Sequence, residues 1–243
     1  MHEIHPAYLR RLASAAESRS VDGAFAVRTG IASNTENGVV STAARLEPEV
    51  IADLLEWLVD VPASWVALDP ALGPSLVAAG CTPENDAWNM QAEIGDVAEP
   101  PHEVRTVGSP AELDEWLAIV RDCGWFDDVE PARRLYEGLG YEGLYLAEHG
   151  AASAFFAPAT VLLNTVAVRP RMQRRGIGRS LTLARLRDAR ARGCTSAILA
   201  PSPDGRKLYA SLGFRTEPQP PGYWFYLPNR SSSRAAPALT PVR

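Results

Sequence analysis

The stretch TVAVRPRMQRRGIGRSLTLARLRDARARG, residues 165–193, decides the fold. An apolar run ends at Arg169 and Pro170, and the segment QRRGIGRS follows with three arginines and two glycines. An amphipathic pattern then predicts a helix that continues to Arg192. Glycines let a backbone turn tightly, and the first amides of a helix lack intrahelical partners and attract negative charge. The residues therefore predict an anion site, which a diphosphate fits.

The predicted anion site stands out against the rest of the chain, which is mildly acidic. The formal net charge is −5, which argues against a nucleic-acid or membrane partner. Any affinity for an anion must then be local. The amides from Arg174 to Ser180 would converge on it, and Arg174, Arg175 and Arg179 add charged donors.

Three diphosphate-binding patterns compete for this segment. A P-loop requires GxxxxGK[ST], and there is no lysine here. A dinucleotide fingerprint requires GxGxxG, but the third glycine is replaced by Leu181. QRRGIG instead fits the pattern Q/R-x-x-G-x-G/A of the coenzyme A loop in acyltransferases. A basic loop before an ordinary helix is the structural alternative.

The neighbouring segments favour the coenzyme A pattern. Residues 104–228 resemble the GNAT superfamily of N-acetyltransferases, because VLLNTVAV, QRRGIGRS, SAILA and LYASLGF occur in the family's order. The resemblance implies an α/β (α+β) fold, with a central mixed, mostly antiparallel sheet flanked by helices. It also implies acetyl-CoA as co-substrate and direct transfer of the acetyl group to a primary amine in a ternary complex.

The resemblance assigns roles to particular residues. Tyr209 matches the general acid that protonates the leaving thiolate, with a packing role as the alternative. Ser202 stands where the family often has an asparagine that contacts coenzyme A. The residues expected to bind acetyl-CoA lie on the strand, the loop and the helix start, and comprise Val166, Ala167, Val168, Gln173, Arg174, Arg175, Gly176, Ile177, Gly178, Arg179, Ser180 and Ser202.

The acceptor is less readable than the acyl donor. A small-molecule amine is the expected partner, with a protein N-terminus or a coenzyme A-binding module without turnover as alternatives. Asp127, Asp128 and Glu130 are candidates for the general base, although acidic loop residues are usually just solvated. Trp125 and Phe126 would form a wall of the acceptor site or cap a core.

The chain divides into two predicted lobes and a tail. Residues 1–97 resemble a smaller, degenerate GNAT lobe, residues 103–229 form the catalytic GNAT domain, and residues 230–243 have the composition of a disordered tail. We expect the first lobe to shape the acceptor site without binding acetyl-CoA. We also expect a helix over residues 6–19.

An internal echo links the two lobes. GPSLVAAGCTPE, residues 73–84, resembles GRKLYASLGFRTE, residues 205–217, with Val77 in the place of Tyr209. The strand AWNMQAEI, residues 87–94, would complete the first lobe, and GYWFYL, residues 222–227, would complete the second. The echo suggests a duplicated unit, although two short helices ending in glycine can look alike by chance.

Several classes of site are not expected. Cys81, Cys123 and Cys194 follow no CxxC spacing, which argues against a disulfide framework or a zinc site and for a reduced, cytoplasmic setting. No apolar run approaches the ~20 residues of a membrane span, and the N-terminus lacks signal-peptide features. The excess of arginine over lysine and the abundant alanine suggest a bacterial source. The oligomeric state stays open.

Overall fold

The computed structural model describes residues 4–84, 88–218 and 223–228. The chain forms two compact units, one of Met1–Ala16 with Asn85–Pro220 and the other of Glu17–Glu84 with Pro221–Arg243. These boundaries differ from the predicted lobes, because an N-terminal helix and one strand of the first half belong to the unit that holds the loop. The predicted tail lies outside the described residues.

The unit that holds the loop, called the loop unit, is built around one sheet. Its strands follow the order β12-β6-β11-β10-β9-β8-β7. Of these neighbours, β10 and β11 run parallel and the other pairs are antiparallel, so the sheet is mixed and mostly antiparallel, as predicted. Its elements are α1 (Ile4–Leu12), β6 (Trp88–Glu93), β7 (Arg105–Thr106), α4 (Pro110–Asp122), α5 (Glu130–Gly138), β8 (Leu144–Ala147), β9 (Gly150–Phe156), β10 (Thr160–Val168), η2 (Pro170–Met172), α6 (Ile177–Ala191), β11 (Ser196–Leu199), α7 (Arg206–Ala210) and β12 (Arg215–Pro218).

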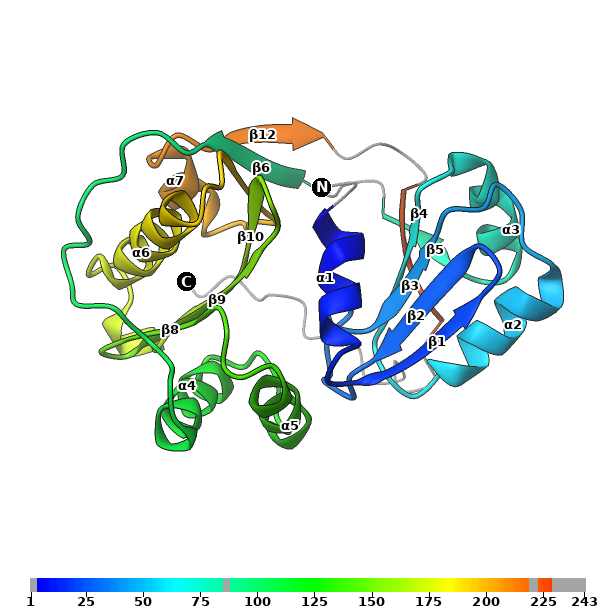
Figure 1. Ribbon diagram of the computed structural model, residues 1–243, viewed down its shortest axis with the longest axis horizontal. Helices are drawn as coiled ribbons and strands as arrows, with labels where there is room; N and C mark the ends of the chain where they lie inside the picture. Colours follow the sequence, from blue (N-terminus) through cyan, green and yellow to red (C-terminus); the bar gives the residue numbers. More distant parts are fainter. Residues whose placement is uncertain (1–3, 85–87, 219–222, 229–243) are drawn as a thin grey trace. The chain divides into compact units, whose positions relative to one another are not determined.

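Helices flank the sheet of the loop unit, and α6 and α4 both pack on β8, β9 and β10 (Figure 1). Helix α6 approaches β9 so closely that a Cβ on Gly150 would lie 2.5 Å from the side chain of Ile177. Helix α4 is anchored by Trp116, whose indole N–H donates to the carbonyl of Ala152 at 3.0 Å. The sheet thereby fixes the start of α6 at the end of β10.

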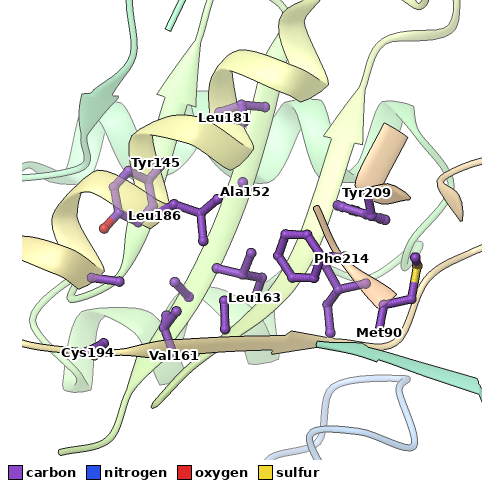
Figure 2. Close-up of a cluster of buried hydrophobic side chains, with 14 of the residues drawn as sticks. Met90, Tyr145, Ala152, Val161, Leu163, Leu181, Leu186, Cys194, Tyr209 and Phe214 are labelled. Carbon is purple, nitrogen blue, oxygen red and sulfur yellow. The ribbon is translucent and has the colours of Figure 1, made fainter. Parts of the chain in front are cut away.

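A buried apolar cluster joins α6 and α7 to the sheet (Figure 2). Leu181 of α6 is fully buried in this cluster, which also contains Leu163 of β10. Tyr209 of α7 lies in the same cluster, in the part that also holds Phe214 and Met90. Each fully buried side chain of this kind contributes about 1.5–3 kcal/mol. The cluster therefore holds α7 firmly against the strands.

The second unit has a smaller sheet with the order β1-β2-β3-β4-β13-β5. Strands β3 and β4 run parallel, with α2 between them in the sequence. Trp65 of β4 lies at the centre of its core, and its indole N–H donates to Ser41 at 2.9 Å. The elements are β1 (Glu17–Val21), β2 (Ala24–Arg28), β3 (Gly38–Ser41), α2 (Pro48–Trp57), β4 (Ser64–Ala67), η1 (Pro70–Leu72), α3 (Gly73–Ala78), β5 (Thr82–Pro83) and β13 (Trp224–Tyr226).

The two sheets exchange a strand, which corrects the predicted lobes. Strand β6 lies between β11 and β12 in the sheet of the loop unit, although the sequence suggests that it completes the first lobe. Strand β13 lies between β4 and β5 in the other sheet. Both exchanged strands pair antiparallel with both neighbours. Periodicity identifies a strand but does not say which sheet edge it will join.

The N-terminal helix is shorter than predicted. The sequence predicts a helix over residues 6–19, whereas α1 ends at Leu12 and residues Glu17–Val21 form β1. Strand β1 pairs with β2 along its whole length, from Glu17 opposite Arg28 to Val21 opposite Ala24. Pairing with a neighbour outweighs the helical pattern here.

Candidate functional site

The loop between β10 and α6 turns sharply and leads into the first amides of the helix. Arg174 and Gly176 both have positive φ, 63° and 86°, so the backbone curls twice before the helix begins. The first helical hydrogen bond runs from the N–H of Ser180 to the carbonyl of Gly176 at 2.9 Å. The amides ahead of Ser180 therefore precede the hydrogen-bond ladder of α6. No acidic residue lies in the first turn, so the positive end of the helix dipole is not offset there.

Side chains of the loop divide into those that face solvent and those that hold the loop together. Arg174 and Arg175 are exposed. Gln173 donates to the carbonyl of Val168 at 3.2 Å and closes the turn. The side chain of Ile177 is buried in the apolar cluster. Its backbone amide is therefore the group that could face the predicted anion site. Arg179 donates to Ser211 at 3.3 Å.

Ser180 and Ser202, both predicted to bind acetyl-CoA, use their hydroxyls within the protein. The Ser180 side chain has no exposed surface, and its hydroxyl donates to the carbonyl of Gly176 at 3.2 Å. Ser202 accepts the N–H of Gly205 at 3.2 Å and so helps to start α7. These two hydroxyls therefore stabilise the backbone at the starts of α6 and α7.

His102 supports the loop from the segment that precedes β7. Its ring nitrogen Nε2 lies 2.7 Å from the carbonyl of Arg175, and its backbone N–H donates to the hydroxyl of Ser180 at 3.1 Å. A Cβ on Gly176 would lie 3.3 Å from the same ring nitrogen. The sequence analysis missed this residue, because it stands in a polar segment without a recognisable pattern.

Strand β10 leaves its parallel neighbour next to the loop. Within the described residues, its pairing with β11 covers Thr160–Leu162 opposite Ser196–Ile198. Further along, the register with β9 shifts between Leu163 and Val166, so that Asn164 and Thr165 together oppose Ser153. The pairing with β11 thus stops just before this β-bulge, and a bulge bends the strand that carries it. The residues from Val166 to Val168 thus pair on one side with β9 and open on the other.

Tyr209 lies on α7 beside this opening. Its side chain is 8% exposed, and its ring stands edge-on to Phe214 at 5.8 Å between centroids. Burial raises the pKa of the phenol, and the nearby positive charge of Arg185 acts in the opposite direction. On the same side, a Cβ on Gly178 would meet Leu208 at 3.5 Å and Val166 at 3.8 Å. The loop, strand β10 and helix α7, which carries Tyr209, are therefore neighbours.

The residues proposed for the acceptor side have mainly structural partners. The Asp128 carboxylate accepts the N–H of Glu130 at 3.0 Å, and Glu130 pairs with Arg133 at 3.4 Å. Phe126 is buried and Trp125 is 48% exposed. The structure thus gives Asp128 and Glu130 the partners of a helix start.

A pocket of about 100 Å³ is lined in part by the bulge residues Asn164 and Ser153. Aromatic side chains also line it. The lining comes from α1, α5, β8, β9, β10 and the segment before β8, and comprises Tyr8, Arg11, Leu12, Tyr136, Leu139, Glu142, Leu144, Ser153, Ala154, Phe155, Phe156 and Asn164. At its edge Arg11 and Glu142 form an ion pair of 3.0 Å.

Two classes of feature are absent from the described residues. No helix there combines the length and the apolar character needed to cross a membrane. In the same part of the chain, no three histidine, cysteine, aspartate or glutamate side chains gather as a metal site would require.

The family comparison matches the segment that builds this site. Residues 142–216, from just before β8 into β12, match the family model described as an acetyltransferase (GNAT) domain. Over these residues the chain is similar to a GNAT domain. No curated protein is similar enough in sequence to count as a relative.

Solved structures share the fold of this chain at low sequence identity. A GCN5-related N-acetyltransferase from Kribbella flavida is 20% identical with a TM-score of 0.65, and covers 93% of this chain and 95% of its own. A GCN5-related N-acetyltransferase from Sphaerobacter thermophilus is 16% identical with a TM-score of 0.52, over 84% and 75%. A functionally unknown conserved protein from Staphylococcus epidermidis is 11% identical with a TM-score of 0.53, over 87% and 92%.

Proposed function

We propose that the GNAT domain transfers an acetyl group from acetyl-CoA to the primary amine of a small molecule. The observation that carries this proposal is the meeting of three elements: free-standing amides at the start of α6, a strand that leaves its neighbour at a bulge, and the buried phenol of Tyr209. Each element meets one requirement of acyl transfer.

The loop fits the diphosphate of coenzyme A. The amides from Arg174 to Arg179 would donate to the phosphate oxygens, with Arg174 and Arg175 adding charge from the exposed side. The glycines keep the cradle open, since a Cβ on Gly176 would press on His102 and one on Gly178 would fill space beside Leu208. The open edge of β10, at Val166–Val168, would pair with the amides of the pantetheine arm.

Catalysis would then depend on donors supplied by this chain. Acetyl-CoA supplies an acetyl carbon already activated as a thioester. The backbone N–H of Val166 or Ala167 would donate to the thioester oxygen as negative charge develops on it. Tyr209 would give its phenolic proton to the departing sulfur. The amine must arrive neutral, and water or a base takes the proton that its nitrogen releases.

The pocket at the bulge supports a small acceptor. Its volume of about 100 Å³ holds a group of a few heavy atoms, far less than a folded partner's surface would need. Asn164 is one of its lining residues and lies two positions before Val166, where the part of β10 assigned to the thioester begins. A protein N-terminus would require a long open groove, and a coenzyme A-binding module would not require Tyr209.

The second unit supports the proposal of a duplicated, degenerate GNAT lobe. Its order β3–α2–β4–α3–β5 repeats the order β10–α6–β11–α7–β12, with parallel strands at the same step. In place of the loop, Glu47 stands at the N-cap position of α2 and Glu49 lies in its first turn, and these negative charges disfavour an anion. Val77 on α3 takes the place of Tyr209. We therefore assign acetyl-CoA to the loop unit alone.

Release of free thiol from acetyl-CoA, measured with a panel of primary amines, tests the function. Amine-dependent thiol release with acetylated product in mass spectra supports an acetyltransferase. Tight coenzyme A binding without product from any small amine would favour the non-catalytic module, and product with peptide N-termini alone would favour the protein acetyltransferase. Absence of coenzyme A binding would remove the proposal.

A further inference from the structure

Arg185 of α6 is a charged residue in the core that the proposed function does not use. Its side chain has no exposed surface. Arginine is almost never fully buried unless an acid accompanies it, because removing the charge from water is costly. In the described part of the chain, the ionisable groups that act on its pKa are the phenols of Tyr209 and Tyr145, and no carboxylate is among them. A guanidinium stays charged at any ordinary pH, so the core keeps this charge.

Neutral oxygen atoms satisfy the guanidinium. Its Nε–H donates to the carbonyl of Leu181 at 3.0 Å, and Nη1 donates to the carbonyls of Ser153 at 2.8 Å and Asn164 at 3.2 Å. Nη2 donates to the hydroxyl of Thr182 at 3.4 Å, and the Tyr209 hydroxyl lies near the guanidinium. Four neutral oxygen atoms thus accept hydrogen bonds from the guanidinium.

Two of these acceptors are backbone carbonyls of residues at the bulge. Ser153 is the single residue of β9 that faces the doubled pair on β10, and Asn164 is the first member of that pair. A bulge leaves backbone groups outside the regular ladder, and a buried carbonyl without a donor is costly. By bridging both carbonyls with one nitrogen, Arg185 fixes the point at which β10 turns toward the proposed thioester site.

Arg185 is also linked to the loop and lies near Tyr209. It donates to the hydroxyl of Thr182, and that hydroxyl donates to the carbonyl of Gly178 at 2.8 Å. Tyr209 faces the guanidinium directly, and Arg185 is the charged group that acts on the pKa of its phenol in the described part of the chain. Tyr145 of β8 also faces Arg185, but its hydroxyl donates to Asp188.

We propose that Arg185 is a positioning residue for the acetyl transfer: it locks the bulge of β10 and the hydroxyl of Tyr209 in one arrangement and offsets the charge that Tyr209 acquires. The catalytic part of this statement rests on the proposed function. When the O–H bond of Tyr209 breaks and an S–H bond forms, the electron pair stays on the phenol oxygen. A cation beside that oxygen stabilises the phenolate until the proton released by the amine nitrogen restores the phenol.

Fluorine NMR of the full chain labelled with 3-fluorotyrosine tests the coupling without any turnover. The resonance of residue 209 is the one lost in Tyr209→Phe, and ring fluorination lowers the pKa of the phenol into a range where the protein stays folded. Arg185→Met keeps the length and removes the charge, and should move the ionisation midpoint of residue 209 upward by about 1 pH unit or more. Arg187→Met is the matched control, because Arg187 is on the same helix, 42% exposed at the side chain and paired with Glu99.

An unchanged midpoint for residue 209 in Arg185→Met would overturn the proposal whether or not the chain is an acetyltransferase. If Arg185→Met does not fold, as judged by circular dichroism, Arg185→Gln also removes the charge and is read in the same way. In the active enzyme, Arg185→Met should lower kcat about tenfold or more and change the KM for acetyl-CoA by less than about threefold.

A double-mutant cycle separates positioning from general damage. Combined with Tyr209→Phe, Arg185→Met should cost much less kcat than it does alone, because the two residues act as a unit. Equal losses in both backgrounds would contradict the coupling. Absence of amine acetylation by the parent chain would refute the proposed function and leave the fluorine titration to decide the role of Arg185.

Discussion

Gly176 and Gly193 enclose α6 in the same left-handed conformation, with φ of 86° and 85°. The first precedes the helix at the proposed diphosphate site and lies close to His102, and the second follows the helix in open space. The backbone requirement is therefore equal at the two ends, whereas the dipole is positive at one and negative at the other. The same substitution at these two glycines therefore distinguishes an effect of backbone strain from an effect on ligand binding.

Gly176→Asp should weaken coenzyme A binding about tenfold or more, because it adds a carboxylate where the phosphate would lie. Isothermal titration calorimetry with coenzyme A gives the dissociation constant. Gly193→Asp introduces the same side chain at the same φ and should leave that constant unchanged. Equal affinity in both variants would refute the assignment of the loop.

Arg174→Ala should also weaken coenzyme A binding, by a smaller factor, since one exposed charge–phosphate contact is lost and screening limits its strength. The loss should shrink as salt is raised. Arg171→Ala, in η2 ahead of the loop, is the control for overall charge. A loss of the same size in both variants would indicate general attraction instead of a defined contact.

Tyr209→Phe should lower kcat roughly a hundredfold while the dissociation constant of coenzyme A stays the same, because only proton donation to sulfur is removed. Steady-state rates of thiol release and calorimetry measure the two quantities. Tyr226→Phe removes a phenol hydroxyl in the other unit and should leave both quantities unchanged. Full turnover in Tyr209→Phe would exclude this residue as the acid.

Much of the loop region is encoded locally, and the structure agrees with the sequence there. The sequence SPAE, residues 109–112, has the spacing of a capping box, and helix α4 begins there, with Ser109 accepting the N–H of Glu112 at 3.3 Å. The carboxylate of Glu112 in turn accepts the N–H of Gly108 at 2.9 Å. Caps and turns depend on a few neighbouring residues, so single positions reveal them.

The strand exchange and the network around Arg185 could not be predicted, for a different reason. Strands β6 and β13 have ordinary strand patterns, and their sheet is chosen by partners far along the chain. Arg185 is visible in the sequence as a cation between Leu181 and Ala189 on the apolar face of α6. Its partners at Ser153 and Asn164 are carbonyls, which every residue carries, so no side chain marks them.

Gly150→Ala should lower the free energy of unfolding by about 1–3 kcal/mol, because the added methyl group overlaps the side chains of Ile177 and Leu181 at 2.5 and 3.0 Å. Urea denaturation followed by circular dichroism measures the change. Gly95→Ala adds the same group where no atom lies within 4 Å and should be nearly neutral. Equal stability of the two variants would mean that α6 does not press on β9.

Protonation of His5 should destabilise the fold in acid. Burial in α1 lowers the pKa of His5 to about 3, below its ordinary value of 6.5. The unfolded chain therefore binds this proton more readily, and the stability that His5 contributes above pH 6.5 is lost as pH falls from 6.5 toward 3, by at most about 1.4 kcal/mol per pH unit.

Urea titrations at several pH values measure this dependence on His5. His5→Gln should flatten the curve between pH 6.5 and 4, whereas His149→Asn, at a turn with positive φ, should retain the parent slope. A parent-like slope in His5→Gln would show that other groups cause the acid sensitivity.

A crystal structure of the chain with bound coenzyme A tests the central claim most directly. We predict that the diphosphate accepts hydrogen bonds from amides between Arg174 and Arg179, and that the pantetheine arm pairs with β10 between Val166 and Val168. A diphosphate bound elsewhere, with those amides facing only water, would contradict the account.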